Sequence, residues 1–320
     1  MKKFGVLIIC ILCLVLSSCS LAACSFMHEQ TEDIHIIYTN DVASKIDKNF
    51  DYAGVKGYTD YVKSNNKYVA LVDAGDFYDG DVSHLSNGEY ITQIMNVVGY
   101  DVVTIGNQEF AIGLDALANN IHEADFDFVS CNIKYVGEGK DVLSGVKPYV
   151  IKNYGGVRVA FVGVTTPETL IENKQAYEAI TVNGVPQYDF YGANDGQDLY
   201  EQIQKTVNKA RKRAEYVILL AHLGSNSVTE GWSSKDVIMN TYGIDAVIDG
   251  HSHTPIEGEV VLNKNGEDVA LTSTGEKLQN LGEMILHPDH TINTTLYQTV
   301  YEIDAGVKEM VESIFEEIGE

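Results

Sequence analysis

The chain has 320 residues and a formal net charge of −24 at pH 7, with 46 acidic and 22 basic side chains. This excess of negative charge repels polyanions and no basic patch is visible, so the protein is not expected to bind nucleic acid. Roughly 290 residues beyond the N-terminal segment are enough to bury a full core as one large domain.

The N-terminus has the pattern of a bacterial lipoprotein signal. Two lysines precede an apolar run over residues 4–16, which is too short to span a bilayer comfortably. Small residues followed by Cys19 resemble a lipobox, and a second match ends at Cys24. We therefore expect a signal peptide over residues 1–24, cleavage before Cys19 or Cys24, and an extracytoplasmic protein anchored to a bacterial membrane by lipid. The alternative is an ordinary secretory signal whose cysteines carry no lipid.

Cysteine usage excludes a disulfide framework. Of the five cysteines, Cys10 and Cys13 fall within the predicted signal, and Cys131 is the one thiol clearly inside the expected folded part. The compartment would allow disulfides, but the folded part has no second cysteine to pair with it.

After a tether over residues 25–33, strands alternate with helices. Apolar and β-branched runs predict strands, and apolar residues at helical spacing predict helices. The expected strands cover 34–39, 68–74, 101–105, 126–131, 157–164, 216–221 and 246–249. The expected helices lie within 50–65 and over 89–98, 114–122, 198–214 and 234–241.

The last third of the chain changes character. Its apolar stretches alternate with turn residues and lack intervening helices, which predicts antiparallel strands over 260–262, 269–274, 283–286 and 291–301. A final amphipathic helix is expected over 304–318. Residues 167–196 show no clear hydrophobic period and are interpreted as a surface segment that passes over the site. This order of elements predicts two sheets packed face to face with helices outside.

Polar residues follow several of the predicted strands at their carboxyl ends. Six side chains share this position: Asp41, Asp76, Asn107, His222, His251 and His253. Open α/β sheets gather their sites at this edge, so we expect these side chains to meet. Carboxylate, amide and imidazole ligands together suit zinc, manganese or iron better than calcium. Two such ions bridged by Asp76 would clamp a phosphoryl group and supply a hydroxide nucleophile.

Seven motifs occur in one order along the chain: YTND at 38–41, DAGD at 73–76, GYDVVTIGN with a following glutamate at 99–109, CNI at 131–133, GVTTPET at 163–169, LLAHLG at 219–224 and DGHSHT at 249–254. Together they resemble the metallophosphatase domain of the 5′-nucleotidase family, within the calcineurin-like metallophosphoesterase superfamily. The resemblance implies a four-layer αββα sandwich of two mixed sheets over 34–300, followed by a C-terminal helix over 301–320.

The resemblance also assigns the site residues. Asp41 and His253 would hold a first ion, Asp76 would bridge, and the second ion would be held by Asn107, His222 and His251. Asn107 and Gln108 would act on the substrate.

Two positions depart from the family. Ala43 and Gln108 stand where the family has histidines, one a ligand of the first ion and the other in contact with the phosphate. Glutamine donates a hydrogen bond but carries no charge or transferable proton near neutral pH. We therefore expect one strongly bound divalent ion, held by Asn107, His222 and His251, and a second, weakened site at Asp41 and His253. His84 is the candidate to fill the gap at Ala43, and an exposed loop histidine is the alternative.

Two functions remain open from the sequence. The first is a lipid-anchored metal-dependent phosphoesterase acting on a phosphorylated small molecule. The second is an inactive accessory lipoprotein that binds a metal or a phosphorylated ligand. A transport-type solute-binding lipoprotein would not need the DAGD and GHSH motifs. The aromatic nucleoside clamp of the family's second domain has no counterpart within these residues, so base recognition is not expected. The oligomeric state stays open.

Overall fold

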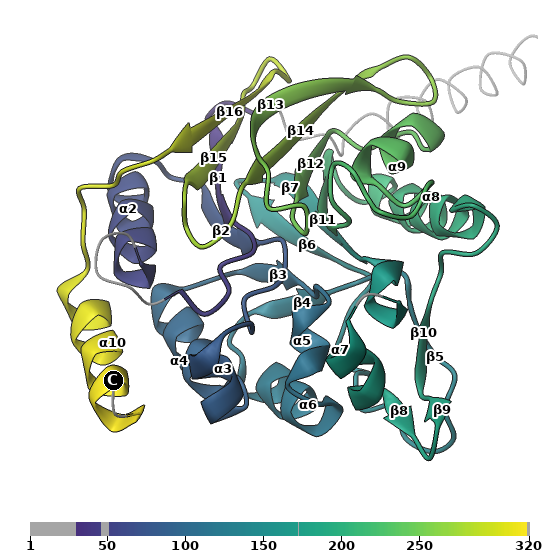
Figure 1. The fold of residues 1–320 in the computed structure, drawn as a ribbon. Coiled ribbons are helices and arrows are strands. Elements are labelled where there is room, and N and C mark those ends of the chain that lie inside the picture. The colour runs from purple at the N-terminus through teal and green to yellow at the C-terminus, as the bar shows by residue number, and fades with distance from the viewer. Residues whose placement is uncertain (1–29, 46–50, 172, 319–320) are drawn as a thin grey trace, which may run out of the picture.

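The computed structural model describes residues 30–45, 51–171 and 173–318 (Figure 1). The predicted signal peptide, both candidate lipidation cysteines and most of the tether lie outside these residues. Among the described helices, none combines the length and the apolar character that crossing a bilayer requires.

Two six-stranded sheets form the centre of the molecule. The first has the order β16-β15-β1-β2-β3-β4 and the second β13-β14-β12-β11-β7-β6. The first contains β1 (Ile34–Thr39), β2 (Val69–Asp73), β3 (Val102–Thr104), β4 (Asp127–Val129), β15 (Leu281–Leu286) and β16 (Ile292–Tyr297). The second contains β6 (Tyr149–Tyr154), β7 (Val157–Thr165), β11 (Tyr216–His222), β12 (Ala246–Asp249), β13 (Pro255–Leu262) and β14 (Asp268–Thr274).

Both sheets are mixed, as predicted. In the first, β1 to β4 are parallel, and β15 joins β1 antiparallel. In the second, β7, β11, β12 and β14 are parallel. The prediction that the last strands are all antiparallel was wrong for β14. The chain leaves β12 for the edge strand β13, and the hairpin back places β14 between them, parallel to β12 and antiparallel to β13.

Helices cover the outer faces of the two sheets (Figure 1). The inner faces share a buried apolar layer that includes Ile36 and Val72 from one sheet and Phe161 and Ile218 from the other. Outside the first sheet lie α2 (Tyr52–Asn65), α4 (Glu89–Val98), α6 (Leu114–Glu123) and α10 (Ala305–Ile318). Outside the second lie α8 (Gln197–Arg211) and α9 (Ser234–Asn240). The four-layer αββα sandwich is confirmed.

Local sequence explains where these helices begin and end. Gly99 adopts φ 87° and its N–H bonds the carbonyl of Met95, which ends α4 at the predicted residue. Ser233 and Asp236 form a reciprocal capping box at the start of α9. The predicted stripe on α8 is buried, namely Leu199, Ile203, Val207 and Ala210.

The segment 167–196 contains several short elements that the sequence did not predict. They are η1 (Pro167–Leu170), α7 (Lys174–Ala179), β8 (Thr181–Val182), β9 (Val185–Pro186) and β10 (Tyr188–Phe190). β10 pairs with β5 (Ile133–Tyr135). Two further short helices were also missed, α3 (Asp81–Ser86) and α5 (Gln108–Ala111), and α7 packs against α5. Elements this short carry too few residues to show a period.

Gln30 attaches the start of the described chain to both sheets. Its side-chain N–H donates to the carbonyl of Leu286 at the end of β15, over 2.7 Å. The hydroxyl of Tyr216, the first residue of β11, donates to Gln30 Oε1 over 2.8 Å. The chain therefore enters the sandwich at the amino ends of the parallel strands.

A buried carboxylate, Glu283 on β15, joins helix α2 to the first sheet. It accepts hydrogen bonds from the hydroxyls of Tyr58 on α2 (3.0 Å) and Tyr297 on β16 (2.9 Å). Its other oxygen lies 2.7 Å from Nδ1 of His35 on β1. Burial acts to raise the pKa of Glu283, but His35 and the two hydroxyls outweigh it and leave that pKa lowered.

Glu283→Gln should therefore destabilise the protein in a pH-dependent way. A carboxyl whose pKa is lowered by folding stabilises the fold above its unfolded pKa, here 4.5, and this contribution is lost as the pH falls through the folded value. We expect a loss of about 1–3 kcal/mol in the free energy of unfolding at pH 7, shrinking steadily below pH 4.5, in urea titrations. Glu312→Gln on the exposed face of α10 is the control. An equal loss at every pH would contradict the assigned role.

Candidate metal centre

The six predicted residues lie at the carboxyl ends of parallel strands from both sheets. Asp41, Asp76 and Asn107 follow β1, β2 and β3 in the first sheet. In the second sheet His222 ends β11, and both His251 and His253 follow β12. Because the sheets pack face to face, these strand ends converge at one edge of the sandwich.

Distances between their side chains are short enough for a shared ion. Nε2 of His222 lies 3.1 Å from Asp76 Oδ2 and 3.9 Å from Asp41 Oδ1. Nε2 of His253 lies 3.3 Å from Asp41 Oδ1. One ligand atom from each of Asp76, His222 and His251 falls within 4.8 Å of the other two, a spacing that suits a single metal ion.

His222 has the orientation that metal ligation requires. Its Nδ1 lies 2.8 Å from the carbonyl oxygen of Ala74. A carbonyl only accepts, so Nδ1 carries a hydrogen in either protonation state and Nε2 is the nitrogen that faces Asp76. Although burial acts against it, the carboxylates of Asp76 and Asp41 raise the pKa of His222 to about 10. A divalent ion at this position would replace the proton on Nε2.

Among the predicted ligands, two buried polar atoms make no well-formed hydrogen bond within the described residues, although one of them pairs closely with Asp76, and both fit a metal. They are Nε2 of His222 and Oδ1 of Asn107. Asn107 directly precedes Gln108, whose backbone N–H donates to Asp76 Oδ1 over 2.8 Å. Buried polar atoms are nearly always satisfied, so the unpartnered amide oxygen of Asn107, next to the closely paired Asp76 and His222, indicates a site for a cation.

Glu168 on η1 orients the third histidine. Its carboxylate is buried, lies 2.8 Å from Nε2 of His251, and accepts the backbone N–H of Thr229 over 2.9 Å. With Nε2 donating to a carboxylate, Nδ1 of His251 keeps its lone pair for a metal. Sequence reasoning included Glu168 in the GVTTPET motif but gave it no role. The run of polar residues directly after an apolar strand in that motif was the available signal.

The site predicted for the first ion is less complete. Asp41 is held by the backbone N–H of His251 (2.9 Å) and the side-chain amide of Asn40 (2.7 Å). The side chain of His253 is 51% exposed, and its Nδ1 lies 3.5 Å from Glu276. Ala43 offers no ligand atom, as the sequence indicated.

His84 does not fill the gap at Ala43 in this structure. It lies on α3 with an exposed side chain, and within the described part of the chain that side chain makes no ion pair or hydrogen bond. The interpretation of His84 as an exposed residue is the one that agrees with these contacts.

The backbone around the centre is strained. Four of the predicted ligands adopt left-handed φ values of 50–78°: Asp41, Asp76, His251 and His253. Such conformations cost a non-glycine residue free energy and cluster at functional sites. Glycine at position 250 allows the backbone after β12 to approach Asp41 and His222 closely. A Cβ there would lie 2.9 Å from Asp41 Oδ2 and 2.8 Å from His222 Nδ1.

Glu109 ties together the loops that carry Asp76 and Asn107. Its buried carboxylate accepts backbone N–H groups over 2.6–3.0 Å from Asp76, Phe77, Tyr78 and Gly106. Burial and the nearby Asp76 raise the pKa of Glu109 to about 7, while the four donors favour its ionised form. The position of Asp76 therefore depends on Glu109.

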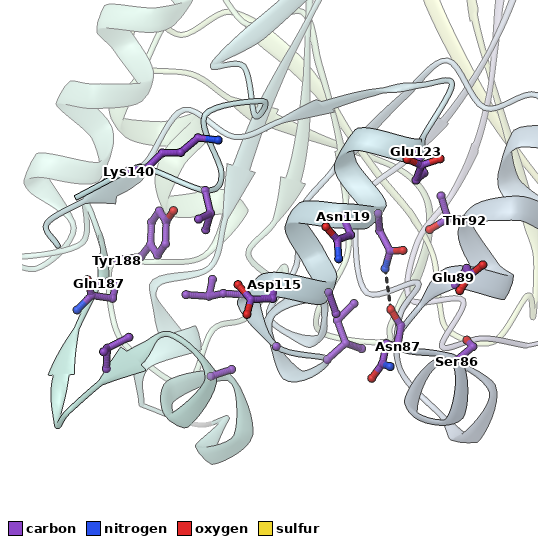
Figure 2. A pocket seen from close by; sticks show the side chains of 18 of the residues that line it. Ser86, Asn87, Glu89, Thr92, Asp115, Asn119, Glu123, Lys140, Gln187 and Tyr188 are labelled. Carbon is purple, nitrogen blue, oxygen red and sulfur yellow. Dashed lines mark hydrogen bonds between the residues drawn. The ribbon is translucent and has the colours of Figure 1, made fainter. Parts of the chain in front are cut away.

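A separate groove of about 980 Å³ contains none of the six residues (Figure 2). Its walls include Asn87 and Glu89 near α3 and α4, Asp115 and Asn119 on α6, and Tyr188 on β10. Amides and carboxylates line this groove together with apolar side chains such as Ile112 and Val142. The metal centre is therefore a site of its own at the sheet edge.

This chain is similar to several known proteins in sequence. The sequence pattern of the family described as bacterial capsule synthesis protein PGA_cap matches residues 59–276. The trifunctional nucleotide phosphoesterase protein YfkN of Bacillus subtilis is 28% identical over 285 residues, covering 79% of this chain and 18% of that protein. A snake venom 5′-nucleotidase from Gloydius brevicauda is 29% identical over 252 residues, covering 73% of this chain and 38% of that protein.

Two solved structures share the fold. The 5′-nucleotidase precursor from Thermus thermophilus has a TM-score of 0.76 at 22% identity, over 90% of this chain and 59% of that one. The calcineurin-like phosphoesterase YfkN from Bacillus subtilis has a TM-score of 0.69 at 23% identity, over 90% of this chain and 98% of that one. This chain spans less than two fifths of the length of the two relatives matched by sequence.

Removing Glu168 should weaken the metal centre without removing a ligand. In Glu168→Ala, His251 loses the acceptor that fixes its ring, and groups in that position typically contribute about 10–100-fold to metal affinity. Titration of the chelator-treated protein with zinc or manganese measures the change. Glu230→Ala, an exposed carboxylate next to Thr229, is the matched control. Unchanged affinity in Glu168→Ala would show that His251 needs no such support.

Proposed function

We propose that this chain, which belongs to the PGA_cap family, is a metal-dependent phosphoesterase of the calcineurin-like type with a domain of the 5′-nucleotidase kind. The observation that carries the proposal is the set of Asp76, His222 and His251, the first two buried and the third partly buried, whose ligand atoms lie within 4.8 Å of one another. The buried amide oxygen of Asn107, which has no hydrogen-bond partner within the described residues, and the 3.1 Å approach of His222 Nε2 to Asp76 support the same assignment.

The residues divide into two ligand sets that share Asp76. Asn107, His222 and His251 complete the stronger set, and Asp41 and His253 form the weaker one, which lacks a ligand at Ala43. When bound, divalent ions such as zinc, manganese or iron polarise phosphoryl oxygens and lower the pKa of water. Asn107 and Gln108 then act on the substrate, and Gln108 contributes a neutral amide where the family has histidine.

The proposed substrate is a phosphorylated small molecule. The relatives named as nucleotidases and nucleotide phosphoesterases are much longer than this chain, so nucleoside recognition is not part of the proposal. The catalytic domain would cover residues 34–300. We also propose that the protein is extracytoplasmic and anchored by lipid at Cys19 or Cys24, since the N-terminal pattern matches a lipobox.

Metal analysis combined with a phosphatase assay tests the function. The purified protein should hold about one tightly bound divalent ion per chain and hydrolyse para-nitrophenyl phosphate when manganese, zinc or iron is added. Asp76→Asn should reduce the rate to background, because this carboxylate belongs to both ligand sets. Asp115→Asn, an exposed carboxylate on α6, serves as the control. One ion or none, without turnover under any metal, would refute the enzyme and favour the accessory binding protein.

Ala43→His should complete the weaker ligand set. Imidazole is a better ligand than the methyl group it replaces, and even groups that only orient a ligand contribute about 10-fold or more to affinity. We therefore expect the ion in the weaker set, held by Asp41 and His253, to bind at least that much more tightly, with occupancy approaching two ions per chain by elemental analysis. Asn119→His on the exposed face of α6 controls for adventitious binding. Two tightly held ions in the unmodified protein would show that another residue already fills the gap.

A further inference from the structure

Two side-chain amides form a directional chain of hydrogen bonds next to the metal centre. Asn173 caps helix α7, and its Oδ1 accepts the backbone N–H of Ala176 over 2.9 Å. A backbone N–H only donates, so the orientation of the Asn173 amide is fixed by chemistry. Its Nδ2 must therefore be the atom that donates to Gln108, over 3.0 Å.

This contact fixes the orientation of Gln108 as well. Its Oε1 faces Asn173, so its Nε2 faces the other way with two hydrogens to donate. Within the described residues no side chain or carbonyl accepts from Nε2, and it is not one of the buried orphaned atoms. The backbone N–H of the same residue bonds Asp76 over 2.8 Å. Gln108 therefore lies against a predicted metal ligand with an unused donor.

We propose that Gln108 Nε2 is a neutral hydrogen-bond donor to a phosphoryl oxygen of the bound ester, and that Asn173 is the positioning residue that keeps this donor turned toward it. The proposal rests on the proposed function of the centre. It assigns a role to segment 167–196, which supplies both Asn173 and Glu168. It also explains how a site without the family histidine at Gln108 still presents a donor there.

A neutral donor has a distinct chemical consequence. Glutamine does not titrate near neutral pH, so the donor persists at every pH at which the protein is folded. It transfers no proton, so any proton that the leaving oxygen requires must come from another group or from water. A preorganised donor still stabilises the charge that develops on the phosphoryl group.

Asn173→Asp tests the orientation directly. Aspartate caps a helix as well as asparagine does, so α7 is retained. It offers Gln108 an acceptor in place of a donor, which should turn the Gln108 amide over and present Oε1 to the phosphate. We expect kcat for para-nitrophenyl phosphate, and the affinity for inorganic phosphate by calorimetry, to fall about 10-fold each, equivalent to about 1.4 kcal/mol. Metal content and melting temperature should stay unchanged.

Repeating Asn173→Asp in variants of Gln108 shows whether Asn173 positions Gln108 or has only a general structural role. In Gln108→Ala, the added Asn173→Asp should have no further effect. In Gln108→His, the same Asn173→Asp should raise the rate, since a carboxylate accepts from the imidazole and orients it, and a pH-dependent limb near neutrality should appear. An equal loss in all three backgrounds would overturn the proposal.

The unmodified protein and the Asn173→Asp variant together show whether the positioning role or the phosphoesterase function fails. If the unmodified protein turns over substrate or binds phosphate but is insensitive to Asn173→Asp, the function stands and the positioning role fails. If the metal-loaded protein neither turns over substrate nor binds phosphate, both fail.

Discussion

One buried carboxylate holds the metal centre together. Glu109 accepts four backbone N–H groups from the loops that follow β2 and β3, over 2.6–3.0 Å. A buried charge is costly unless it is fully hydrogen-bonded, so neither loop can move away without leaving that charge unpaired. Asp76 lies in one loop and Asn107 in the other. Glu109 therefore holds these two residues at their spacing before any ion binds.

The histidines are oriented by acceptors placed behind them. The carbonyl of Ala74 fixes His222, and the carboxylate of Glu168 fixes His251. A carboxylate also lies behind His253, where Oε2 of Glu276 is 3.5 Å from Nδ1. Half of this imidazole is exposed to solvent. The acceptors that orient the histidines are therefore closer and better shielded from solvent in the stronger ligand set than in the weaker one. The site is asymmetric in its surroundings as well as in its ligands.

Much of the fold and the site follows from the sequence, for identifiable reasons. The bounds of β1, α4 and β12 match the predictions, because a buried strand or an amphipathic helix leaves a period that can be read directly. The six candidate ligands were recognisable because each follows such a strand. Glu168 and Asn173 were not, because each lies in a short irregular element and gains its role only through a contact across the fold. The parallel placement of β14 likewise depends on its neighbours in the sheet and not on its own residues.

The attachment of Gln30 has a consequence for how the molecule presents its centre. Gln30 is bonded where β15 ends and β11 begins, at the amino ends of the parallel strands, while the ligands lie at the carboxyl ends. The six residues of β1 separate these two edges by about 20 Å at the usual rise of a strand. If the chain is anchored at its N-terminus by lipid, as proposed, the edge that carries the metal centre is the one away from the anchored end. Dissolved phosphate esters would then reach it from the surrounding medium without passing between the protein and the surface.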